Sequence, residues 1–134
     1  MTFPNQRNRF LDDAVATASP ARLLTMLYDR LVLDLTRAEA AVRDGDRAAA
    51  HHQLLHAQSI VSELLSTLDV DAWDGAPGLA NLYSFLLQSL VRANMNQDAE
   101  LVAECRTVVE PLREAWHAAA ITVATTGSAV GATA

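Results

Sequence analysis

Three histidines within six residues form the densest group of potential metal ligands in this sequence. His52 and His56 stand four residues apart, so in a helix they would share one face, as in a two-histidine metal site. A closed zinc site needs four ligands, and no third or fourth ligand lies at a supporting position. Since His51 lies beside them, we expect a polar outer helix face here and predict no metal site.

Two other features near the C-terminal end could also do chemistry. Glu114 and His117 have the Glu-x-x-His spacing of di-iron bundles, but such a site needs a second copy of that motif, which is absent. We expect two exposed residues near a helix end instead. Cys105, the single cysteine, lies on an apolar stripe and is expected to pack rather than react. We therefore predict neither a metal nor any other cofactor.

His56 permits a different interpretation as well. In histidine phosphotransfer bundles an exposed imidazole in the middle of a helix carries a phosphoryl group. Those domains have small and basic residues after the histidine, whereas Ala57, Gln58 and Ser59 follow here and all ten basic residues are arginine. The chain also lacks a Gly-rich phosphate loop and a nucleophile–base pair. We predict that the protein is not an enzyme, and a phosphotransfer-like signalling bundle stays as the alternative.

Composition narrows the class of protein further. The chain has 134 residues, of which 51% are hydrophobic and 19% charged, enough for one domain with a real core. Its net charge of −6 counts against nucleic acid as a partner, because phosphate binding needs a basic field. No uncharged apolar run approaches the roughly 18 residues of a membrane span, and the polar start resembles no signal peptide. We expect a cytoplasmic protein with no direct membrane insertion.

The elements that position these side chains are helices. Alanine and leucine dominate, and apolar residues recur at steps of three and four. Short loops between consecutive long helices favour antiparallel neighbours. The predicted fold is all-α, an up-down-up-down four-helix bundle with helices over residues 20–43, 47–68, 79–94 and 99–123. Residues 1–18 are expected to form an N-terminal arm, 19–124 the bundle and 125–134 a disordered C-terminal tail.

The first long helix carries more apolar residues than one neighbour needs. Ser19 is expected to cap it and Pro20 to occupy its first turn, where a missing N–H costs nothing. Leucine, methionine, valine and tyrosine then surround most of the helix instead of forming one stripe. This surplus is the first indication that the chain binds another chain.

Four segments in fixed order resemble the flagellin-specific export chaperone family, FliS. They read TASPARLLTMLYD (17–29), AQSIVSEL (57–64), LANLY (79–83) with LVRAN (90–94), and LREAW (112–116). Together they cover nearly the whole chain from Ala14 to Trp116. The resemblance implies a small cytosolic helical bundle that binds the disordered C-terminal segment of flagellin and prevents its premature polymerisation. It further implies delivery of flagellin to the cytosolic domain of the membrane export gate, without ATP or metal.

An amphipathic client helix would lie in a groove between bundle helices. Phe10, in the arm, stands where the family usually has tyrosine and is a candidate contact or plug. For every other candidate taken singly, packing in the core is the competing interpretation. The candidate partner-binding residues are Phe10, Leu24, Leu27, Tyr28, Leu31, Ile60, Leu64, Tyr83, Leu86 and Leu90.

Overall fold

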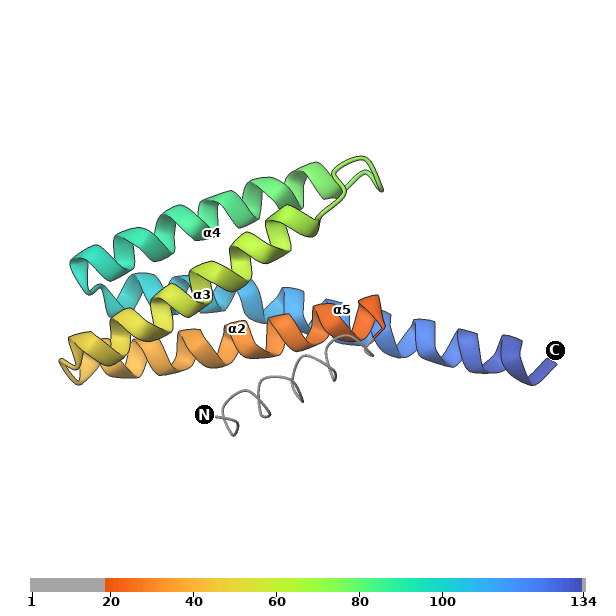
Figure 1. Cartoon of the computed structure of the whole chain (residues 1–134), viewed down its shortest axis with the longest axis horizontal. Helices are drawn as coiled ribbons and strands as arrows, with labels where there is room; N and C mark the ends of the chain where they lie inside the picture. The colour runs from red at the N-terminus through yellow and green to blue at the C-terminus, as the bar shows by residue number, and fades with distance from the viewer. Residues whose placement is uncertain (1–18, 134) are drawn as a thin grey trace, which may run out of the picture.

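Four antiparallel helices make up the described part of the chain. The computed structural model describes the backbone of residues 19–133 and the side chains of residues 19–121. The helices are α2 (Pro20–Arg43), α3 (Arg47–Thr67), α4 (Ala76–Asn96) and α5 (Ala99–Thr133). Figure 1 shows that each runs opposite to the one before it, which confirms the predicted all-α, up-down-up-down bundle. Residues 1–18, including Phe10, lie outside the described residues.

Local sequence signals set most of the helix ends. Ser19 Oγ accepts a hydrogen bond from the backbone N–H of Arg22 at 3.2 Å, as predicted for its cap. The carboxylate of Asp46 caps α3 by accepting from the backbone N–H of Ala49 at 3.1 Å. Asp98 does the same for α5 at the backbone N–H of Leu101, also at 3.1 Å. These side chains satisfy N–H groups that have no partner inside their helices.

Two helix ends differ from the prediction by three residues or more. Helix α4 begins at Ala76 and not at Leu79, because Pro77 falls in its first turn, where the missing N–H breaks no helical hydrogen bond. Helix α5 continues to Thr133, ten residues beyond the predicted end near Val123. Residues 124–133 contain three alanines, three threonines and two glycines but no proline, so no residue there removes a helical N–H. Figure 1 shows the last turns of α5 extending beyond the end of the bundle.

Helix α2 lies between two neighbours, and this position explains its wide apolar surface. It packs extensively on both α3 and α5, whereas α4 packs on α3 and less extensively on α5. A helix covered on two sides needs a wider apolar arc than a helix covered on one. The apolar surplus in the sequence of α2 is therefore largely covered by the bundle itself, with Leu33 as its exposed large apolar side chain at 38%.

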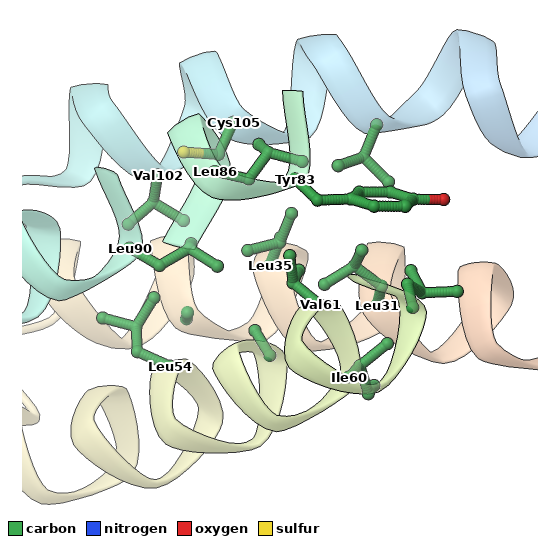
Figure 2. Close-up of a cluster of buried hydrophobic side chains, with 14 of the residues drawn as sticks. Leu31, Leu35, Leu54, Ile60, Val61, Tyr83, Leu86, Leu90, Val102 and Cys105 are labelled. Carbon is green, nitrogen blue, oxygen red and sulfur yellow. The ribbon is translucent and has the colours of Figure 1, made fainter. Parts of the chain in front are cut away.

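The core runs the length of the bundle and receives side chains from every helix. Figure 2 shows Leu31 and Leu35 of α2 facing Val61 of α3 and a layer from the two remaining helices. Each of these residues is essentially inaccessible to solvent, so their burial removes apolar area from water and stabilises the bundle. The labelled members of that layer are Tyr83, Leu86, Leu90, Val102 and Cys105.

Candidate functional site

Most of the predicted partner-binding residues are core residues in this structure. Leu24 and Leu27 are half-buried and pack against the edge of the core. The other residues named for α2, α3 and α4 are at most 6% exposed and form no surface that a client could reach in this conformation. These buried residues are Tyr28, Leu31, Ile60, Leu64, Tyr83, Leu86 and Leu90.

The two tyrosines form a buried polar contact inside this core. The hydroxyl oxygens of Tyr28 and Tyr83 are 2.5 Å apart and join α2 to α4 across the bundle. Burial raises the pKa of Tyr83, and its hydrogen bond to Tyr28 raises it further. Burial also raises the pKa of Tyr28, although hydrogen bonds from Tyr83 and Trp116 oppose the rise. Both hydroxyls therefore stay protonated and act as structural hydrogen-bonding groups.

An open apolar groove lies next to this contact, between the start of α4 and the middle of α5. It has a volume of about 250 Å³ and is lined by apolar side chains alone. Trp116 forms part of the groove and also packs against the core. Figure 1 shows α4 and α5 diverging toward this end of the bundle. The lining residues are Trp73, Leu79, Leu112, Ala115, Trp116 and Ala119.

The α3–α4 connection holds one wall of this groove in place. Trp73 is 52% exposed, and its ring covers Gly75 so closely that a Cβ at Gly75 would lie 1.9 Å from a ring carbon. Only glycine leaves room for the indole in this position. In the sequence, Gly75 lies close to Pro77 and Gly78, which favours a helix break. Leu112 and Trp116 are four residues apart and so share one helix face. Small and large apolar residues alternate along this face of α5, and this pattern was the available sequence signal for a groove. The pattern could not show that the α3–α4 loop folds over this face.

A buried carboxylate that the sequence reasoning missed joins α2 to α3. Asp34 is fully buried, and its carboxylate accepts from Arg30 Nε at 3.0 Å and from His56 Nδ1. A buried charge of this kind is tolerated when it is paired and hydrogen-bonded. The His56 side chain remains 44% exposed. Its ring is thus bound to the bundle through one nitrogen, and the polar outer face expected for it is only part of its environment.

A second cluster joins α2 to α5 on the side of α5 away from the groove. Asp29 accepts from Arg113 Nε and from His117 Nε2, each at 2.6 Å. Burial alone would raise the pKa of Asp29, but the hydrogen bonds from His117 and Arg113 outweigh it and lower the pKa. His117 was predicted to be merely exposed near a helix end, whereas it contributes to this interhelical contact. About two turns earlier in α5, Arg106 pairs with Glu39 of α2.

None of these clusters has the ligand set of a metal centre. Among the described residues, no three histidine, cysteine, aspartate or glutamate side chains converge closely enough to hold a metal ion. His51 is turned toward α4, where Asn94 Nδ2 donates to its Nδ1 at 2.7 Å. Cys105 is buried, and burial raises the pKa of its thiol to about 11. A thiol with so little thiolate at neutral pH is a poor nucleophile.

Comparison with known proteins agrees with this architecture. Within the described residues no helix combines the length and apolar character needed to cross a bilayer. A family profile described as Flagellar protein FliS matches residues 3–123. The Flagellar secretion chaperone FliS of Bacillus subtilis is 29% identical over 119 residues, which are 89% of each chain. That of Salmonella typhimurium is 32% identical over 108 residues, 79% of this chain and 80% of the relative. The chain therefore belongs to the FliS family.

Proposed function

We propose that this protein is a flagellar secretion chaperone that binds the C-terminal segment of flagellin in the cytoplasm. Its groove at the start of α4 would hold an amphipathic helix of that segment and keep flagellin from polymerising. The chaperone would then deliver the client to the cytosolic domain of the export gate. The observation that carries this proposal is a wholly apolar, open groove in a chain that belongs to the FliS family.

The shape of the groove suits a helix better than a small molecule. Its volume of about 250 Å³ is below the roughly 300–1,000 Å³ of ordinary ligand pockets, and it offers no convergent polar group. Ala115 and Ala119 form one exposed strip of small side chains on α5. A partner helix can approach such a strip closely and insert one large apolar residue between Trp73 and Trp116.

Binding would act by covering apolar surface and would need no reaction step. A disordered client loses about 2–5 kcal/mol in ordering, so it must bury a large area to bind well. The 250 Å³ groove is too small to supply that area alone. The half-buried Leu24 and Leu27, together with Phe10 of the arm, remain candidates for additional contacts. Deleting residues 1–17 tests the arm, because a large loss of affinity would show that it supports the client.

Co-expression with flagellin tests the proposed client. We expect a one-to-one complex on gel filtration with full-length flagellin and no complex when the C-terminal segment of flagellin is deleted. If the truncated flagellin binds equally well, the proposed client segment is wrong. The step to the export gate is tested separately, by adding the gate's purified cytosolic domain to the loaded complex.

A pair of matched substitutions tests the groove. Ala115→Arg places a charged side chain in the groove and is expected to weaken flagellin binding by about tenfold or more. Ala40→Arg is the control, because Ala40 is also an exposed alanine inside a helix but lies outside the groove. Circular dichroism should show the same helix content in both variants. Equal binding by both variants would refute the groove as the binding site.

A further inference from the structure

A second apolar surface lies on the outer side of α3 and α4, near the end of α4. Leu55 and Val91 are each 45% exposed, and Met95 is 74% exposed. Asn94 contacts His51 across the two antiparallel helices, and Leu55 and Val91 lie about one turn farther along their helices from that contact. Met95 follows Val91 by four residues and so lies on the same side of α4. We call Leu55, Val91 and Met95 the α3–α4 face.

Helices α3 and α4 themselves carry two arginines and one glutamate, and the acidic residues nearest this face, Asp46 and Asp98, cap the starts of α3 and α5. The chain carries 16 acidic and 10 basic residues. Helix α3 nevertheless contains one acidic residue, Glu63, and the only charged residue of α4 is Arg92. Arg47 is exposed beside Met95, where both line a groove of about 640 Å³ with His51. In the part of the chain that the structure describes, neither Arg47 nor Arg92 has an ion-pair partner.

The α3–α4 face lies at the opposite end of α4 from the groove between α4 and α5 that is proposed to bind flagellin, which we call the client groove. The client groove includes Leu79, in the first turn of α4, whereas Met95 is in the last turn. Sixteen residues of helix separate the two, which is about 24 Å along the axis. A helix seated on one surface would therefore leave the other free, so both partners could be bound at the same time.

We propose that the α3–α4 face is a docking site for an acidic amphipathic helix of a second protein. Leucine-type anchors of that helix would cover Val91 and Leu55 and enter the groove beside Met95. Carboxylates along its edges would pair with Arg47 and Arg92, because these guanidinium groups have no acidic partner among the described residues. An anionic membrane is the poorer fit, since surface binding to such lipids uses clusters of about 4–8 Lys or Arg.

Two synthetic peptides of about 18 residues provide the test. Both carry leucines at helical spacing, and they differ only in having glutamate or lysine along the edges of the apolar stripe. By fluorescence anisotropy with the full chain, we expect the glutamate peptide to bind about tenfold or more tightly than the lysine peptide. The double variant Arg47→Glu/Arg92→Glu should reverse this order, and Met95→Ser should weaken the glutamate peptide by about tenfold. Equal binding of both peptides, or no reversal in the double variant, would overturn the proposal.

Further measurements separate this site from other surfaces. Ala115→Arg, which blocks the client groove, should leave the affinity for the glutamate peptide unchanged. If this variant lost affinity for the peptide, the peptide would bind in the client groove and not on the α3–α4 face. Anionic vesicles that bind the chain and displace the peptide would identify a membrane site and overturn the proposal. Sedimentation should show a monomer whose mass does not change with Met95→Ser. A dimer that dissociates in this variant would show that a second copy covers the face.

Discussion

The buried contact between Tyr28 and Tyr83 allows one precise test of how the bundle is held together. Their hydroxyl oxygens are 2.5 Å apart, and the residues are 0% and 2% exposed, so water cannot replace a lost partner. Tyr83→Phe removes one hydroxyl and preserves the ring that packs in the core. The variant therefore leaves the Tyr28 hydroxyl without its partner on α4.

The expected cost follows from leaving a buried hydroxyl without its partner. A buried polar group without a partner destabilises a protein by about 1–3 kcal/mol. Because Tyr28 is fully buried, we expect about 1–3 kcal/mol for Tyr83→Phe. Removing both hydroxyls in Tyr28→Phe/Tyr83→Phe eliminates the unpaired group. The double variant should therefore lose less stability than the sum of the single variants, by about 1 kcal/mol.

Urea unfolding followed by circular dichroism measures these free energies. With a urea dependence of about 2 kcal/mol per molar, the loss for Tyr83→Phe shifts the midpoint by about 0.5–1.5 M. Phe85→Leu is the control, because Phe85 is an aromatic residue of the same helix but is 54% exposed, and its effect should stay within about 0.5 kcal/mol. The reasoning is refuted if Tyr83→Phe matches the wild type, or if the two tyrosine substitutions are additive.

Three further predictions concern the groove wall, the ion pairs and the thiol. Gly75→Ala should displace the Trp73 ring and weaken flagellin binding about tenfold without unfolding the bundle. Gly78→Ala is the control, because a Cβ at Gly78 meets nothing within 4 Å, and this variant should bind flagellin normally in the same pull-down assay. The pKa of Asp29 is lower in the folded protein than its ordinary value of 3.8, so the ionised carboxylate stabilises the fold at any pH above 3.8. This stabilisation is lost as the pH falls through the folded-state pKa. Asp29→Asn should therefore be less stable than the wild type in urea at pH 7 but equal to it near pH 2. Cys105, whose pKa is raised to about 11, should resist iodoacetamide at pH 8 in the folded protein and react promptly in urea, as mass spectrometry would detect.

The sequence predicted the secondary structure well because its signals are local. A cap such as Ser19 or Asp98 acts on backbone groups within one turn, and the leucine spacing of each helix depends only on the helical repeat. The start of α4 was placed three residues late, because a proline in a first turn looks the same in sequence as a proline in a loop. The C-terminal extension of α5 was missed because its threonines and glycines resemble a tail.

The candidate site was much harder to predict than the helices. An apolar stripe shows which face of a helix is covered, but it does not show whether the cover is another helix of the bundle or a partner. Tyr83 and Leu86 were assigned to the client surface for this reason, and the structure buries both. Trp73 stands in the connection between α3 and α4, and its place opposite Trp116 depends on how that loop folds back.

By itself, the sequence determined the all-α class, the four helices, their antiparallel order and the membership in a family that its motifs suggested. Those properties depend on the helical repeat, on short loops and on residues close together in the chain. The packing of the helices was needed to show that α2 is covered on two sides, that Asp34 is buried beside His56, and that an apolar groove opens next to Trp116. Each of these depends on which helices become neighbours and how far apart they lie, and packing between distant segments sets both.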